Sequence, residues 1–191
     1  MSQNYQDKPK RLRGRPRTFD TKHVVDTAVE AYWRRDPADV SINEICQMAR
    51  VSKPSLYREF GNEDGFICAA LDSYAERILS DIFAILQSGK GLQRTLEALT
   101  EFACDDPRME TGCLFLKMRA GKHRLGPATR ARLDELDAAA QSACMKFLQD
   151  CQNTGEWASN YPIDASARYL KEQIGLAITQ RSSGEEEDTY Y

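Results

Sequence analysis

Apolar residues recur every three or four positions along most of this chain, and nowhere do they alternate with polar residues. This spacing matches the 3.6-residue turn of an α-helix and not the two-residue repeat of a β-strand. The sequence therefore predicts an all-α protein without internal repeats. Beyond residue 60 we expect helices over residues 65–86, 112–118, 128–153 and 164–183, and a further one marked by Leu92, Leu96, Leu99 and Phe102 that ends at Asp105.

Length and composition are those of an ordinary globular protein. The chain has 191 residues, of which 41% are hydrophobic and 29% charged, enough for one compact unit or two small ones with a real core. No apolar run approaches the roughly 18 residues that a membrane-spanning helix needs, and no hydrophobic segment follows the basic N-terminus as in a signal peptide. We expect a cytoplasmic protein that makes no contact with a membrane.

The residues that hold metals or perform catalysis are sparse. Six cysteines occur without a C-x-x-C pair, and the two histidines lie far apart in sequence. In a reducing compartment these cysteines are expected to be free thiols, most of them in the core. Neither a metal site nor a cofactor is expected, and without a zinc-protease motif, a phosphate-binding loop or a nucleophile–base pair an enzyme is disfavoured.

Positive charge gathers at the N-terminus. The whole chain carries a net charge of −3, yet the segment from Lys8 to Arg17 holds six basic residues in ten. A basic arm on an acidic body favours contact with a polyanion. The alternative for such a run is a solvated tail that aids solubility.

Three short helices are expected to follow the arm. Asp20 can cap the first, which should end before Pro37. Ser41 begins a capping box at the second, and Ser52 can cap a third whose first turn tolerates Pro54. A tight turn around residues 50–51 would then join two short helices in a helix-turn-helix arrangement.

In that arrangement the N-terminal end of the second helix of the motif enters the DNA major groove. Short polar or basic side chains are required there, and Lys53, Pro54 and Ser55 meet this requirement. Leu56 and Phe60 should face inward, which leaves Tyr57 and Arg58 to reach the sugar-phosphate backbone. The pattern alone is equally typical of a helical hairpin that has no role with DNA.

Residues 17–66, including SINEICQMARVSKPSLYREFGNEDGF, resemble the N-terminal domain of TetR-type transcriptional regulators. The residues that carry the resemblance are Ile45, Ala49, Val51, Ser52, Leu56, Tyr57, Phe60, Gly61 and Asn62. The resemblance implies that the residues at or near DNA are Ser41, Ser52, Lys53, Pro54, Ser55 and Tyr57, with Arg15 and Arg17 reaching a groove or the backbone. Two positions depart from the family: Asp36 often corresponds to Gly, and Glu63 often to a phosphate-binding Lys.

The resemblance also implies an organisation for the whole chain. We expect a basic arm over residues 1–18, a DNA-binding domain over 19–64, and an effector-binding and dimerisation domain over 65–191, where the ETGCLF segment is the best local match. In the family the last two helices of each subunit form a four-helix bundle across a two-fold axis. Gly175 and Ala177 would allow close approach in that bundle, and a brief final helix could start at Glu185–Asp188.

The function implied is that of a homodimeric repressor, released from a palindromic double-stranded DNA operator by a small-molecule effector. Aromatic side chains could line the effector pocket, although aromatics at helical spacing more often form the core: Phe83, Phe102, Phe115, Trp157 and Tyr161. If Thr111 capped the next helix, Cys113 would lie in its first turn, where the helix dipole favours a reactive thiolate; the alternative is an inert buried thiol. A regulator controlled by a protein partner or by oxidation of Cys113 also remains open.

Overall fold

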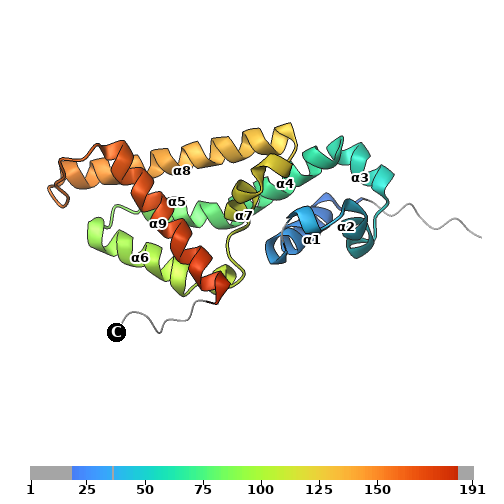
Figure 1. Ribbon diagram of the computed structural model, residues 1–191, viewed down its shortest axis with the longest axis horizontal. Helices are drawn as coiled ribbons and strands as arrows, with labels where there is room; N and C mark the ends of the chain where they lie inside the picture. Colours follow the sequence, from blue (N-terminus) through green and yellow to red (C-terminus); the bar gives the residue numbers. More distant parts are fainter. Residues whose placement is uncertain (1–18, 36, 185–191) are drawn as a thin grey trace, which may run out of the picture.

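The structure is a computed structural model that describes residues 19–35 and 37–184. Over those ranges it contains helices and connecting segments but no β-strand, as the periodicity predicted. The helices are α1 (Thr21–Arg34), α2 (Ile42–Ala49), α3 (Lys53–Phe60), α4 (Glu63–Tyr74), α5 (Ser80–Leu86), α6 (Leu92–Cys104), α7 (Leu114–Ala120), α8 (Pro127–Asn153) and α9 (Ile163–Ser183). Helices α1 to α3 form one end of an elongated molecule, and α8 runs along one side of the remainder (Figure 1).

The predicted N-terminal caps of the first three helices are present. Backbone amides at the starts of α1, α2 and α3 donate to the side chains of Asp20, Ser41 and Ser52, at 3.0, 3.2 and 3.2 Å. In contrast to a reciprocal capping box, the carboxylate of Glu44 accepts a hydrogen bond of 2.7 Å from Arg35. Helix α1 ends before Pro37, as expected; Asp36 lies outside the described residues.

One long helical rod joins the two ends of the molecule. It comprises α4, a π-helical turn η2 (Ala75–Leu79) and α5, and it covers the predicted 65–86 helix with two additional residues at its start. Asn62 caps α4 by accepting a hydrogen bond of 2.8 Å from the amide of Gly65. The π-helical turn, which the periodicity did not predict, is the kind of irregularity often found at functional sites.

A single large core connects the N-terminal helices to the rest. It includes fully buried side chains of α1, of α3 and of the long rod, such as Val24, Leu56 and Phe66, and continues to Leu114 and Ile178. A second cluster fills the space between α5, α6, α8 and α9. Because the first cluster is continuous, α1 to α3 are packed against α4 rather than tethered by a linker.

Helices α6, α8 and α9 begin and end within one residue of their predicted bounds. The prediction for α7 was wrong at its start. The helix begins at Leu114, and its N-cap residue is Cys113, whereas Thr111 is an exposed residue two positions earlier. Gly112 adopts a positive φ of 81°, which a helical first turn does not permit.

Gly175 and Ala177 are both partly buried in the single subunit. A Cβ atom added at Gly175 would meet the side chain of Leu116 at 3.4 Å, and Ala177 packs against the large core. They flank the buried side of α9, and their predicted role between two subunits stays a prediction. The proposed final helix at Glu185–Asp188 lies outside the described residues.

Among the helices that the structure describes, none is both long and apolar enough to cross a membrane. Residues 19–35 and 37–184 also contain no group of three or more His, Cys, Asp or Glu side chains that could hold a metal ion.

Candidate functional site

The turn between α2 and α3 is tight because Arg50 adopts a left-handed conformation, with φ 55° and ψ 42°. The amide of Val51 then donates to the carbonyl of Cys46 at 3.0 Å. Residues other than Gly, Asn and Asp seldom adopt this conformation. The turn places the start of α3 on the surface, since Ser52 and Pro54 are both exposed.

Helix α3 has one buried side and one available side. Leu56 is fully buried, and the ring of Phe60 lies 5.0 Å from that of Phe66 and 6.3 Å from that of Phe19. These contacts confirm the predicted inward face. They fix the rotation of α3 about its axis, so Pro54 and Arg58 are exposed on the opposite side.

Two predicted DNA-contacting residues lie side by side on α3. The ammonium group of Lys53 lies 5.3 Å from the centre of the Tyr57 ring, a cation–π distance. The Tyr57 hydroxyl donates a hydrogen bond of 3.4 Å to Glu63. Glu63, at which this chain departs from the family pattern, thus fixes the side chain of Tyr57 through a hydrogen bond.

Three further predicted residues, Ser52, Ser55 and Arg58, border a hollow of about 640 Å³. His23 of α1 and Arg50 of the turn, which the sequence analysis did not single out, border the same hollow. The signal for Arg50 was its place in the turn, which is where a left-handed residue is required. Ser41 is exposed at the start of α2, and Arg15 and Arg17 lie outside the described residues.

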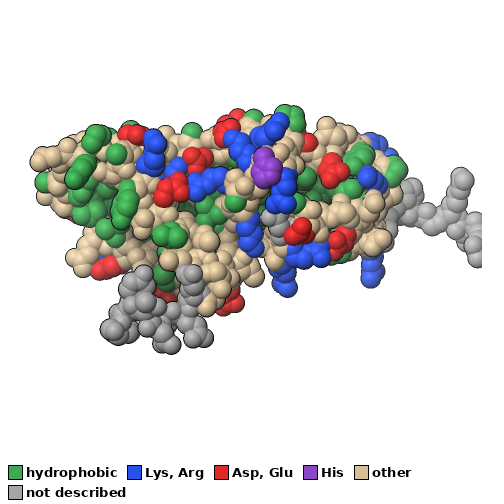
Figure 2. Space-filling model, viewed as in Figure 1, with side chains coloured by type: hydrophobic (Ala, Val, Ile, Leu, Met, Phe, Trp, Pro, Cys, Tyr) green, Lys and Arg blue, Asp and Glu red, His purple; other side chains and the backbone are tan. Residues whose placement is uncertain are grey.

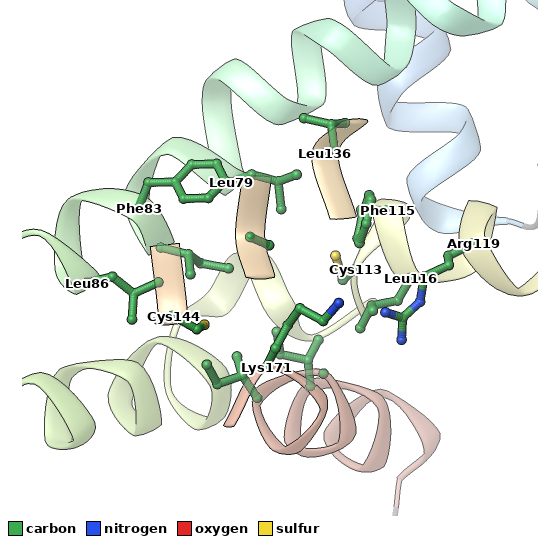
Figure 3. A pocket seen from close by; sticks show the side chains of 15 residues that line it. Leu79, Phe83, Leu86, Cys113, Phe115, Leu116, Arg119, Leu136, Cys144 and Lys171 are labelled. Atoms are coloured by element: carbon green, nitrogen blue, oxygen red, sulfur yellow. The ribbon is translucent and has the colours of Figure 1, made fainter. Parts of the chain in front are cut away.

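A separate cavity of about 70 Å³ lies among α5, α7, α8 and α9 (Figure 3). Of the predicted effector residues, it brings together Phe83, Phe115 and Cys113. Phe102 instead packs in the large core with Arg108 over its ring, and Trp157 packs against the second cluster. Tyr161 is 78% exposed, so its predicted place in a pocket was wrong.

Two cationic residues, Arg119 and Lys171, complete the wall of this cavity. Lys171 donates to Asp137 at 2.8 Å, and Arg119 donates to Asp137 at 3.1 Å and to Glu172 at 2.7 Å. Burial acts to raise the pKa of Asp137, but hydrogen bonds and charges from the two cations outweigh it and hold that pKa below its ordinary value. The network therefore ties α7, α8 and α9 together beside the cavity.

Cys113 is buried between the cavity and the long rod. The hydroxyl of Tyr74 donates to its Sγ atom at 3.2 Å. Burial raises the pKa of the Cys113 thiol, and the hydrogen bonds that the sulfur accepts lower that pKa by less, so the net shift is upward. The amides of Phe115 and Leu116, in the first turn of α7, do act to lower this pKa as predicted, but burial outweighs them, so the predicted reactive thiolate was wrong.

The segment that carries Cys113 is also bonded to α1. The indole of Trp33 donates to the carbonyl of Gly112 at 2.6 Å, and Lys117 donates to the carbonyl of Trp33 at 2.5 Å. The ring of Trp33 meets that of Tyr74 edge-on, with centroids 4.9 Å apart. One wall of the cavity is thus in direct contact with the N-terminal helices.

Helix α9 exposes large apolar side chains on the outer surface. Tyr169 is 68% and Leu176 47% exposed, and they lie seven residues apart on one helix face. Hydrophobic side chains gather on the visible face at the end formed by α8 and α9 (Figure 2). Large exposed apolar patches on folded proteins are common at interaction sites.

Residues 24–70 match the model of the family described as bacterial regulatory proteins, tetR family. The chain is 24% identical to the transcriptional repressor BdcR of Escherichia coli over 141 residues, 74% of this chain and 72% of BdcR. It is 34% identical to the repressor ComR of the same organism over 68 residues, 36% of this chain and 32% of ComR.

The fold recurs in solved structures. One is a cysteine-substituted form of the TetR family regulator CifR, whose structure contains 26bp operator DNA. It superposes with a TM-score of 0.69 at 21% identity and covers 88% of this chain and 90% of that one. From α1 to α4 this chain thus carries the DNA-binding domain of the TetR family of bacterial regulatory proteins, and its remaining helices have the fold of TetR family regulators.

Proposed function

We propose that this protein is a homodimeric repressor that a small-molecule effector releases from a palindromic operator. The observation that carries the proposal is the apolar cavity beside Phe83 and Phe115, which lies in the same chain as the helix-turn-helix motif. We also propose that the chain divides near residue 64 into a DNA-binding domain and a domain for effector binding and dimerisation.

DNA reading is assigned to the exposed side of α3. The residues proposed to contact DNA are Arg15, Arg17, Ser41, Ser52, Lys53, Pro54, Ser55, Tyr57 and Arg58, together with Arg50, which borders the same hollow as Ser52 and Ser55. Two α3 helices related by a two-fold axis would enter successive major grooves, so the operator should contain two inverted half-sites.

The homodimer is proposed to form through α9. Its exposed Tyr169 and Leu176 would be buried against a second copy, in keeping with the two-fold symmetry that most homodimers have. The partly buried Gly175 and Ala177, for which close approach between subunits is predicted, lie next to Leu176 on the same helix.

The effector is proposed to be a compact apolar molecule. The cavity holds about 70 Å³ of space, less than the roughly 300–1,000 Å³ of typical ligand pockets, so a ligand would have to displace wall residues as it enters. An effector shifts a conformational equilibrium only if it binds two conformations of the protein with different affinity. Movement of the wall residues would create the second conformation, in which the effector fits better.

The test uses operator DNA selected from a random pool of oligonucleotides and a small-molecule library screened for release of that DNA. Ala140 lines the cavity from α8, whereas Ala138, two residues earlier, is exposed. Ala140→Phe should abolish the response to the releasing compound, and Ala138→Phe should preserve it. Equal responses in both variants, or no compound that releases the wild type, would contradict the proposal.

A second candidate is a redox-controlled regulator. Cys113 borders the cavity and accepts a hydrogen bond from Tyr74, which packs on Trp33 of α1, so a bulky oxidised sulfur would disturb contacts that reach the N-terminal helices. The candidate fails if Cys113→Ser leaves the response of operator binding to hydrogen peroxide unchanged.

A further inference from the structure

Asp64, in the first turn of α4, is hydrogen-bonded to the start of α8. The amides of Ala128 and Thr129 donate to its carboxylate at 2.7 and 3.1 Å. The Thr129 hydroxyl, which is fully buried, donates to the same carboxylate at 2.6 Å. Two helices that lie far apart in sequence thus meet at one side chain.

These bonds give α8 the N-terminal cap that its own sequence lacks. Its N-cap residue is Gly126, which has no side chain to accept a hydrogen bond, and Pro127 follows it. Free amides at a helix start require acceptors, and a carboxylate there also interacts favourably with the helix dipole. Helix α4 does not need Asp64 for its own cap because Asn62 performs that role.

The absence of a side chain at residue 126 is a condition of this contact. A Cβ atom added to Gly126 would fall on the carboxyl group of Asp64. The backbone of Gly126, with φ −72° and ψ 169°, is one that alanine adopts without strain. An alanine at this position would therefore expel the carboxylate while leaving the local backbone intact.

The contact lies between the two sites described above. Helix α3 ends at Phe60, four residues before Asp64. Helix α8 contributes Leu136, Ala140 and Cys144 to the wall of the cavity. A shift of α8 at the cavity would thus be transmitted along a continuous helix to the residue that follows the DNA-reading helix.

We infer that Asp64 is a positioning residue, which sets the orientation of α3 relative to the rest of the subunit by capping α8 from α4. The inference rests on the proposed function, since it concerns how two reading helices of a dimer are placed on two half-sites. A second contact on the same pair of helices, from Arg132 to Asp72 at 2.5 Å, keeps α4 and α8 packed when the cap is lost.

The experiment compares binding to a full operator with binding to a single half-site, at one fixed salt concentration. A change in the orientation of α3 impairs simultaneous contact with two half-sites but leaves contact with one half-site intact. For Gly126→Ala we expect full-operator affinity to fall by about tenfold, within the usual range of coupling between sites, and half-site affinity to stay within about twofold of wild type.

Matched variants separate the cap from general damage. Thr129→Val removes the buried hydroxyl but keeps the two amide bonds, so it should reproduce part of the loss of full-operator affinity, whereas Thr129→Ser keeps the hydroxyl and should bind as the wild type does. Asp134→Asn changes an exposed carboxylate of α8 that pairs with Lys122, and it should leave both affinities unchanged.

Three results would overturn the inference. One is an equal loss of full-operator and half-site affinity, which indicates damage within α1 to α3. Another is a lowered unfolding temperature with an unchanged ratio of the two affinities, which indicates a cap that only stabilises. The third is a wild type that gains nothing from the second half-site, in which case dimeric reading fails and the inference fails with it; in the first two results the wild type keeps that gain and the inference alone fails.

Discussion

Individual side chains of α3 have separate tasks if the proposed reading surface is correct. Leu56 and Phe60 hold the helix in place, whereas Lys53 and Ser55 lie at its N-terminal end, where base edges come closest. Arg58, in the last turn, is better placed for the phosphate backbone. Base contacts determine sequence preference, and phosphate contacts determine affinity for any DNA.

Lys53→Ala should change which base is preferred at one operator position and cost about 1–3 kcal/mol there. Arg58→Ala should weaken binding to all sequences and reduce the slope of affinity against salt by about one phosphate contact. Titrations of operator and scrambled DNA at several salt concentrations measure both effects. A Lys53 variant with unchanged affinity and preference would exclude the proposed placement of α3.

The cysteines also differ in a way that can be measured. Cys104 is exposed, whereas Cys113 is buried and burial raises its pKa. Since the thiolate is the reactive form, we expect Cys113 to react with a thiol reagent at neutral pH far more slowly than Cys104. Mass spectrometry of labelled peptides over time distinguishes the two sites; equal rates would show that the segment before α7 opens readily.

At the scale of elements, α7, α8 and α9 are joined by the ion pairs of Asp137 with Arg119 and Lys171. Because these cations hold the folded-state pKa of Asp137 below 3.8, its ordinary value, the unfolded chain binds more protons near that pH. The stabilisation is therefore fully present above about pH 4 and is lost as the pH falls through the folded-state pKa.

Asp137→Asn should accordingly lower the midpoint of urea unfolding at pH 7, and its difference from wild type should shrink as the pH is lowered below 3.8. Asp134→Asn is the control on the same helix, because Asp134 is exposed and lies outside this network. A difference between Asp137→Asn and wild type that does not change with pH would show that the charge of Asp137 is not the source of the stabilisation.

At the scale of the whole molecule, the proposed dimeric repressor requires two subunits to associate through α9. A double substitution of Tyr169→Asp and Leu176→Asp places charge on the exposed apolar face and should yield a monomer by light scattering, with the full-operator advantage lost. Leu96→Asp is the matched control, an exposed leucine (37%) on α6. Monomers from both variants, or dimers from both, would contradict an interface on α9.

The sequence by itself determined the helices, and most of their ends. Caps at Asp20, Ser41 and Ser52 and the apolar repeat of each helix involve residues only a few positions apart, so they can be read from the chain alone. The inward face of α3 could be predicted for the same reason, from the spacing of Leu56 and Phe60.

Only the tertiary structure decided which helix faces which. Asp64 caps α8 across 64 residues of sequence, Gly175 lies beside Leu116 of α7, and Phe102 lies in the core while Phe83 lines the cavity. The burial that raises the pKa of Cys113 likewise comes from distant segments. Contacts of this kind depend on how several helices pack together, and the periodicity of a single helix carries no information about its neighbours.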